Sequence, residues 1–316
     1  MQDKKTILIV GCGAIGGIYA AYLSQVAQVI GLDANAAHVE AIGRDGLKLS
    51  GRSSMVARFA AYDDPAALDG LRADAVLFLV KSQDTEPAFK SLQPRLAGRP
   101  LLVTLQNGLG NVEILASLCD WDIAQGISTE AGRYRGPGEI EHLIHGEDSW
   151  IGPARGTVAG AAWLAALMNA AGMPTQVAPD PRGAIWSKFI FNSVMNPIGA
   201  IVLGENRARY EVAEVGMLID RMFAECIRVA EAQGIRLSFD PMHLVKKIRS
   251  GELALTRHAG SMALDVAAGR ETEIEAMTGY LVRKAKSLGI AVPITETVYS
   301  LAKGVEYAAR LRREAV

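Results

Sequence analysis

The sequence predicts an α/β protein, with a mostly parallel sheet in its amino-terminal part and an all-α domain after it. From residue 6 to about residue 152, short runs rich in β-branched and other apolar residues alternate with helical stretches, as in βαβ units. The run at 74–80 is apolar without alternation, as expected for a central strand covered on both faces. Beyond residue 182, helical segments follow one another with almost no β-rich run.

A proline-rich stretch separates these two parts. A helix predicted at 158–171 is followed by prolines at positions 174, 179 and 181, so we expect domains at residues 1–179 and 180–316. Residues 138–145 and 149–152 are expected to end the first domain as antiparallel strands. The helices expected in the second domain are 183–196, 212–233, 241–249, 261–268, 273–288 and 294–313. A sheet domain joined to a helical domain leaves a cleft, where sites tend to lie.

The first predicted strand runs directly into a glycine pattern. Residues 6–10 precede a G-x-G-x-x-G sequence made of Gly11, Cys12, Gly13, Ala14, Ile15 and Gly16, and helical spacing follows. The three glycines would serve a tight turn, a close backbone approach to phosphates and close helix–strand packing, in that order. The helix N-terminus would hold the anion. The pattern predicts a Rossmann-type dinucleotide-binding domain, with a purely structural glycine turn as the alternative.

An acidic residue, Asp33, ends the second predicted strand at 28–32. A carboxylate there accepts hydrogen bonds from the adenine ribose 2′-hydroxyl and repels a 2′-phosphate. Asp33 therefore favours NAD(H) over NADP(H). The alternative is that Asp33 only opens the turn formed with Ala34 and Asn35.

Composition excludes several classes of protein. With 33 basic and 34 acidic residues the net charge is −1, which gives no electrostatic case for nucleic acid or an anionic membrane. The first apolar run is too short for a signal peptide, and the most apolar helix-like stretch is too short to span a bilayer. Three scattered cysteines, Cys12, Cys119 and Cys226, fit a reducing compartment. We expect a cytoplasmic protein.

A second cluster of polar residues lies at 186–197. Lys188, Asn192 and Asn196 recur every four residues, so they share one stripe of a helix that is otherwise apolar. Buried unpaired, such groups would cost several kcal/mol, so they need partners, and a ligand is one source. The alternative is that Lys188 reaches water while the amides bond to neighbouring backbone. Asn196 before Pro197 predicts a helix end or kink.

Motifs spread over nearly the whole chain resemble those of the ketopantoate reductase family. Besides the glycine loop and the stripe with Pro197, they are Val80-Lys81, Gln106-Asn107-Gly108, Gly136-Pro137-Gly138, Ser261-Met262 and residues 269–274. The resemblance implies an oxidoreductase that reduces 2-dehydropantoate, or a related branched 2-oxoacid, to the 2-hydroxy acid with NAD(P)H. It also implies a place in pantothenate biosynthesis.

The resemblance implies roles for individual residues. Lys188 would be the general acid, and partial desolvation would bring its pKa toward neutrality and improve proton donation. Glu273 would hold this lysine or the cofactor ribose. The implied substrate-binding residues are Asn107, Lys188, Asn192, Asn196, Asn206 and Ser261. The implied cofactor-binding residues are the loop residues 11–16, Asp33, Lys81, Asn107, Ala131 and Glu273.

The chain departs from the family pattern at two places. Many members carry an arginine for the 2′-phosphate of NADP near Asp33, so NADH is favoured here while NADP(H) stays open. Glu130 follows Ser128-Thr129 where the family often has a histidine, so a new carboxylate near the cofactor could alter substrate choice. Arg270 either anchors a carboxylate or lies at the surface. The apolar helix at 212–232 packs either in a homodimer or in the core.

Other functions are less well supported by the sequence. Within a strand, the odd separation of His142 and His145 sends the two rings to opposite faces, so no metal site is predicted. A dinucleotide-binding regulatory or sensor protein without turnover is the alternative function. Lys188 together with Glu273 favours the enzyme, because a sensor needs neither a proton donor nor its support.

Overall fold

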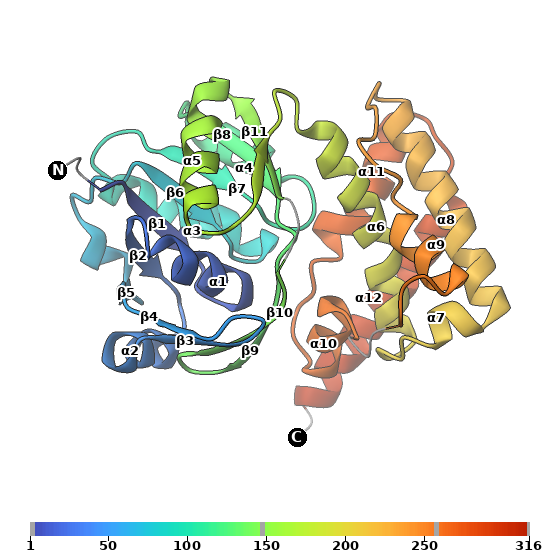
Figure 1. Cartoon of the computed structure of the whole chain (residues 1–316). Helices are drawn as coiled ribbons and strands as arrows, with labels where there is room; N and C mark the ends of the chain where they lie inside the picture. The colour runs from blue at the N-terminus through green and yellow to red at the C-terminus, as the bar shows by residue number, and fades with distance from the viewer. Residues whose placement is uncertain (1–3, 146–148, 256–258, 315–316) are drawn as a thin grey trace. The chain divides into compact units, whose positions relative to one another are not determined.

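The computed structural model describes residues 4–145, 149–255 and 259–314. The chain forms two compact units (Figure 1). The first, the sheet unit, comprises Met1–Gln106 and Asn111–Pro181. The second, the helical unit, comprises Asn107–Gly110 and Arg182–Val316. A four-residue turn from the first half of the sequence thus belongs to the helical unit.

The sheet unit is built on an eight-stranded sheet with the order β12-β11-β8-β7-β6-β1-β2-β5. Its strands are β1 (Thr6–Val10), β2 (Gln28–Leu32), β5 (Ala60–Tyr62), β6 (Ala75–Phe78), β7 (Leu101–Thr104), β8 (Ile123–Ile127), β11 (Ser149–Arg155) and β12 (Thr175–Val177). All pairs are parallel except β11 with β8. The predicted α/β class with a mostly parallel sheet is confirmed.

Both faces of this sheet are covered by helices, which explains why its central strands lack alternation. On β1, Ile7 and Ile9 belong to one core with residues of α1 (Ala14–Leu23) and α5 (Val158–Ala170). The alternate residues of β1 belong to the opposite core, with residues of α3 (Thr85–Leu92) and α4 (Asn111–Leu118). All four residues of β6 are buried, as predicted for this run.

A second, four-stranded sheet was not predicted. Its order is β4-β3-β10-β9, with β3 (Leu47–Gly51), β4 (Met55–Ala57), β9 (Ala131–Gly136) and β10 (Glu139–Ile144). The prediction of an antiparallel ending is confirmed only in part. Strand β10 runs antiparallel to β9 and β11 antiparallel to β8, but β10 and β11 lie in different sheets, and β10 also pairs parallel with β3. The remaining helices of the sheet unit are α2 (Ala36–Asp45), η1 (Pro65–Leu68), η2 (Ser82–Asp84) and η3 (Gln93–Arg95).

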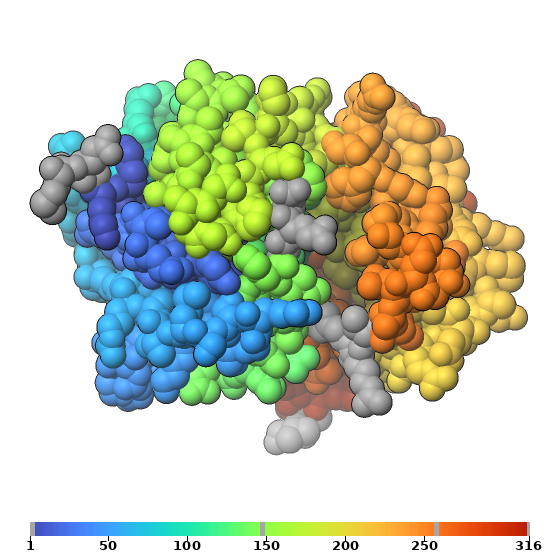
Figure 2. Space-filling model, viewed as in Figure 1, coloured from blue at the N-terminus to red at the C-terminus, as the bar shows by residue number. Residues whose placement is uncertain are grey.

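The helical unit has no strand among its described residues. Its helices are α6 (Arg182–Ile201), α7 (Ala208–Glu211), α8 (Ala213–Glu231), α9 (His243–Ser250), α10 (Ser261–Ala267), the π-helix η4 (Glu275–Gly279), α11 (Tyr280–Ser287) and α12 (Pro293–Glu314). Helices α8 and α9 reach the surface of this unit, where Figure 2 shows them in yellow and orange.

Helix α6 passes through Pro197 and ends at Ile201, so the predicted helix end at Asn196 is wrong. A proline inside a helix removes the hydrogen bond to the carbonyl four residues earlier, here that of Ser193. The hydroxyl of Thr278, on η4, donates to this carbonyl oxygen at 2.8 Å. The tertiary contact therefore satisfies the acceptor that the proline leaves, and the helix can continue.

The apolar face of α8 packs inside the helical unit. Ile219, Met222, Phe223 and Cys226 are fully buried in its core, so this face is core and not a free dimer surface. A homodimer through other surfaces stays a prediction. The buried carboxylate of Glu225, on the same helix, accepts hydrogen bonds from the N–H groups at the start of α12 and so fixes that helix. None of the helices within the described part of the chain is long and apolar enough to cross a membrane.

Candidate active site

The glycine loop joins β1 to α1, and its three glycines meet different constraints. Gly11 has a φ of +90°, and a Cβ there would lie 2.7 Å from the backbone nitrogen of Val80. A Cβ on Gly16 would lie 1.7 Å from the carbonyl oxygen of Gly11. A Cβ on Gly13, which caps the N-terminus of α1, would meet nothing within 4 Å. The fold itself requires the first and third glycines, whereas the middle one borders open space at a helix N-terminus that favours anions.

Asp33 is half-buried beside this loop. Its Oδ2 accepts the N–H of Cys12 at 2.7 Å, and its Oδ1 accepts the N–H of Asn35 at 2.9 Å. The carboxylate therefore opens the turn and also holds the glycine loop. The thiol of Cys12 is fully buried, and burial followed by the charge of Asp33 raises its pKa, so it fills space and is not a nucleophile.

Lys81 lies just past the carboxyl end of β6, the edge of the sheet where open α/β proteins bind ligands. The amide of Gln106 fixes this loop, because its Nε2 donates to the carbonyl oxygen of Val80 and to the hydroxyl of Thr85, both at 2.8 Å. Thr85 in turn donates to the buried Asn111 at 2.9 Å. The Q-N-G sequence was the one signal of this network, and the roles of Thr85 and Asn111 were missed.

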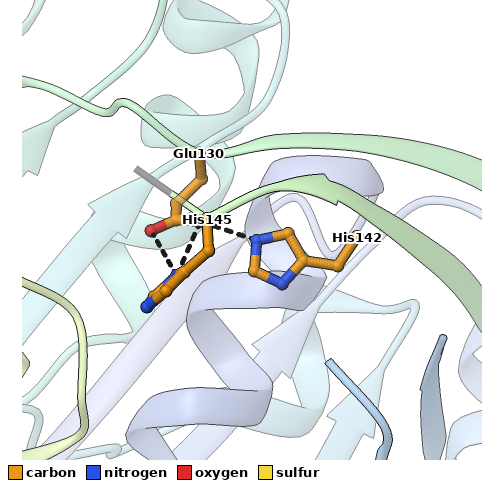
Figure 3. A group of neighbouring side chains, drawn as sticks. All are labelled: Glu130, His142 and His145. Carbon is orange, nitrogen blue, oxygen red and sulfur yellow. Dashed lines mark hydrogen bonds and ion pairs between the residues drawn. The ribbon is translucent and has the colours of Figure 1, made fainter. Parts of the chain in front are cut away.

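Glu130 lies between β8 and β9, directly before Ala131, the first residue of β9. Its carboxylate contacts two imidazoles, at 2.7 Å from Nε2 of His142 and 3.2 Å from Nδ1 of His145 (Figure 3). The expectation that the two rings point to opposite faces is wrong, since their centroids are 5.5 Å apart. Strand β10 shifts register between His142 and Ile144 and then ends, so strict alternation no longer applies.

Between residues 183 and 200, the predicted stripe on α6 is among the less buried parts of that helix. Every residue from 183 to 200 is fully buried except Lys188, Phe191, Asn192 and Asn196, which are part-buried. Buried residues of the same helix belong to the core of the helical unit. The polar stripe therefore lies on the side of α6 that the core leaves accessible.

The turn at Asn107–Gly110 contacts the stripe. Nδ2 of Asn192 donates to Oδ1 of Asn107 at 3.3 Å. The turn is held in place by a hydrogen bond from the N–H of Leu109 to the carbonyl oxygen of Ala276 at 2.8 Å. Gly108 has a φ of +84°, and a Cβ there would lie 2.7 Å from the same carbonyl oxygen, so this contact requires glycine.

Lys188 and Glu273 interact electrostatically. Desolvation lowers the pKa of Lys188 from 10.5 to about 8, and the negative charge of Glu273 opposes this shift. Glu273 lies two residues before the start of the π-helix η4. The N–H of the neighbouring Thr272 donates to Oε1 of Glu306 at 2.8 Å, which positions this segment. The helical unit thus brings together a lysine with a lowered pKa, a carboxylate and several amides.

Two other predicted residues lie beyond the end of α6. Asn206 is buried, and its side-chain oxygen accepts a hydrogen bond from the guanidinium of Arg209. Arg209, which the sequence did not single out, also donates to the carbonyl oxygen of Met195 at 3.1 Å. Ser261 is exposed at the first position of α10. Arg270, left open above, is half exposed and pairs with Asp265 at 2.9 Å.

Comparison with known proteins gives the family. Residues 7–156 match the model for ketopantoate reductase PanE/ApbA, and residues 180–306 match the model for the C-terminal part of the same proteins. The chain belongs to the ketopantoate reductase family. The predicted family resemblance is confirmed.

Relatives within the ketopantoate reductase family match almost the full chain. A 2-dehydropantoate 2-reductase of Halobacterium salinarum is 30% identical over 302 residues, covering 94% of this chain and 97% of that protein. The crystal structure of a PanE/ApbA family ketopantoate reductase from Ralstonia eutropha JMP134 is 33% identical, with a TM-score of 0.86 and coverage of 96% and 99%. A D-mandelate dehydrogenase with NADH and anilino(oxo)acetate, at 21% identity and a TM-score of 0.84, shares the fold.

Proposed function

We propose that this protein is an NAD(P)H-dependent 2-oxoacid reductase that reduces 2-dehydropantoate, or a related branched 2-oxoacid, to the 2-hydroxy acid. The observation that carries the proposal is the stripe on α6. It places a lysine with a pKa of about 8 beside two amides on the accessible side of a helix that is otherwise buried. Several relatives that match nearly the whole chain bear the name 2-dehydropantoate 2-reductase, which supports this choice of substrate.

When bound by the sheet unit, a reduced nicotinamide would supply the hydride for the keto carbon. As negative charge develops on the carbonyl oxygen, the ammonium of Lys188 donates its proton to it. A pKa of about 8 leaves this group mostly protonated at neutral pH and makes it a stronger acid than an ordinary lysine. Glu273 limits the loss of charge, because its carboxylate stabilises the ammonium form.

The amides of the helical unit bind the oxygen atoms of the substrate. Asn192 and Asn107 already contact each other at 3.3 Å, so both can turn toward a substrate oxygen with little movement. The side-chain nitrogen of Asn196 contacts the weak acceptor Sδ of Met277 at 3.5 Å, and it gains a better partner in a carboxylate or hydroxyl oxygen. Asn206 and Ser261 are assigned to hydrogen bonds with the remaining oxygen atoms of the substrate.

The sheet unit supplies most of the cofactor-binding residues. Residues 11–16 hold the pyrophosphate, since Gly13 borders open space at the N-terminus of α1. Asp33 takes the adenine ribose and favours NADH over NADPH, because its carboxylate would repel a 2′-phosphate. Lys81, Asn107, Ala131 and Glu273 are assigned to the nicotinamide half. In this assignment residues 1–179 supply most of the cofactor-binding residues and residues 180–316 supply most of the substrate-binding residues.

The decisive experiment follows nicotinamide absorbance with the purified protein, NADH or NADPH, and a panel of 2-oxoacids. The panel contains 2-dehydropantoate, its analogue without the hydroxymethyl group, and an unbranched 2-oxoacid. We expect cofactor oxidation with stoichiometric formation of the 2-hydroxy acid, fastest with a branched substrate. Tight NADH binding without turnover on any 2-oxoacid would instead support a sensor and contradict the proposal.

A further inference from the structure

A carboxylate and two imidazoles meet in the sheet unit, at the end of the β9–β10 hairpin, in a cluster that the proposed reduction does not use. The ligand atoms are a carboxylate oxygen of Glu130, Nε2 of His142 and Nδ1 of His145, and all lie within 4.8 Å of one another. Figure 3 shows both rings beside the carboxylate. His142 lies on β10, and His145 is the first residue after the end of that strand. Glu130 comes from the segment before β9, so the cluster joins the two ends of the hairpin.

Burial distinguishes this cluster from a surface group of charges. The side chains of Glu130 and His142 are 2% and 0% exposed, whereas that of His145 is 36% exposed. A buried carboxylate needs compensating positive charge or hydrogen bonds. The two imidazoles give the carboxylate hydrogen-bonding partners, and a divalent cation between the three groups would add compensating positive charge.

The distances suit a small metal ion. Zinc binds imidazole nitrogen and carboxylate oxygen at about 2.0–2.2 Å, so its tetrahedral ligand atoms lie roughly 3.3 Å apart. The separations here are 2.7 Å between His142 and Glu130 and 3.2 Å between His145 and Glu130. Movements of a few tenths of an ångström therefore open the carboxylate–imidazole contacts to ligand spacing, and the two imidazole nitrogens lie within 4.8 Å of each other.

A second layer of hydrogen bonds orients the buried imidazole. Nδ1 of His142 contacts Oγ of Ser53 at 2.5 Å, and that hydroxyl contacts the hydroxyl of Tyr22 at 2.7 Å. A histidine that binds metal through Nε2 must carry its proton on Nδ1, where a second group accepts it. Ser53 can be that acceptor. The ring of Tyr22 also stacks on His145, with centroids 5.5 Å apart and an interplanar angle of 14°, which holds the exposed imidazole near the other two groups.

We propose that Glu130, His142 and His145 form a zinc-binding site with a fourth position open to water beside the exposed His145. Two imidazoles and one carboxylate match the ligands that zinc prefers, whereas magnesium and calcium prefer oxygen alone. The bound ion ties the segment before β9 to the end of β10. Its effect is to stabilise the sheet unit, and it takes no part in the reduction of a 2-oxoacid.

The test titrates zinc chloride alone into the full-length protein after chelator treatment, by calorimetry, and measures metal content after gel filtration. We expect one zinc ion per chain in wild type. His145→Ala is the main variant, because this side chain is exposed enough for the fold to tolerate its loss. His243→Ala is the matched control, since His243 is an exposed histidine at the start of α9 in the other unit.

His145→Ala should weaken zinc binding by about 100-fold or more. Loss of a residue that only hydrogen-bonds to a metal ligand already lowers metal affinity by about 10–100-fold, and His145 is a ligand itself. Ser53→Ala should weaken it by about tenfold on the same ground. Zinc should raise the melting temperature of wild type and of His243→Ala, but not of His145→Ala. The far-UV circular dichroism of each variant checks that it is folded.

Wild-type protein that binds no zinc at micromolar concentrations would overturn the site. So would equal zinc affinity in wild type and His145→Ala, since this would place the ion elsewhere on the chain. Neither result depends on oxidation of NADH, so failure of the zinc site and failure of the proposed reductase activity are separately recognised.

Discussion

The glycine loop and the stripe on α6 are both sequence patterns, but the structure constrains them for different reasons. Gly11 and Gly16 are required by the chain itself, because a side chain at either would collide with backbone atoms at 2.7 and 1.7 Å. The lysine and amides of the stripe lie outside the buried core of the helical unit, to which α6 contributes Trp186, Phe189, Ile190, Val194, Met195 and Ile198. A motif that the fold needs is weak evidence for a ligand. Polar groups that lie outside the buried core are stronger evidence.

The strongest test of this contrast is Lys188→Ala. Loss of the proton donor should lower turnover by about 100-fold or more, the scale of general acid catalysis, while NADH affinity stays near that of wild type. Lys90→Ala is the control, because Lys90 is exposed on α3 and pairs with the exposed Glu86. Steady-state kinetics and NADH fluorescence titration measure both effects. Near-normal turnover in Lys188→Ala would remove this residue from the mechanism.

Within the loop, Gly16→Ala and Gly13→Ala should separate folding from binding. The added methyl at position 16 forces the backbone apart, so we expect a loss of about 3 kcal/mol or more in the free energy of unfolding. At position 13 the methyl enters open space, so stability should change by less than about 1 kcal/mol while NADH affinity falls about tenfold. Urea unfolding and NADH titration test the pair. Equal NADH affinity in Gly13→Ala and wild type would contradict phosphate binding at this loop.

Thr278→Val tests how far α6 depends on its neighbour. The variant leaves the carbonyl of Ser193 without its hydroxyl donor, so the free energy of unfolding should fall by about 1–3 kcal/mol. Thr278→Ser keeps the hydroxyl and should lose less. If both substitutions have the same effect on urea unfolding, the hydrogen bond is not what allows the helix to pass Pro197.

The pH dependence of the reaction follows from the pKa of Lys188. The ammonium is the active form for reduction, and its pKa is lowered to about 8, so kcat/KM should be flat at lower pH and fall about tenfold per unit well above pH 8. Oxidation of the 2-hydroxy acid needs the free amine and should rise over the same range. A value of kcat/KM for reduction that does not change between pH 6 and pH 10 would contradict the assignment of Lys188 as the acid.

The smallest effect is expected at Asp33. Asp33→Asn removes the negative charge but keeps a side-chain oxygen. This oxygen can still accept the hydrogen bond from the N–H of Cys12, which is 2.7 Å long in the wild-type structure. The ratio of catalytic efficiency with NADPH to that with NADH should rise about tenfold or less, since the repulsion is between partly solvated groups. Wild-type protein that strongly prefers NADPH would show that Asp33 only organises the turn.

Much of the site could be predicted because it follows short-range rules. The four-residue spacing of Lys188, Asn192 and Asn196 fixes their common face through helix geometry alone, and the structure brings them together as expected. The apolar run at 74–80, which contains β6, could be predicted as a strand covered on both faces from its uniform hydrophobicity alone. Where a local rule failed, at Pro197 and at His142 with His145, a long-range contact or a change of strand register had replaced it.

By itself, the sequence determined the α/β class, the two kinds of unit and the stripe on α6, because periodicity and chain geometry act over a few residues. Only the tertiary structure decided that Asn107 joins the helical unit, that a second sheet forms, and that Glu130 meets two histidines. These outcomes depend on contacts between segments far apart in the chain. Their energy lies in the packing of several elements at once, and no single segment of the sequence contains it.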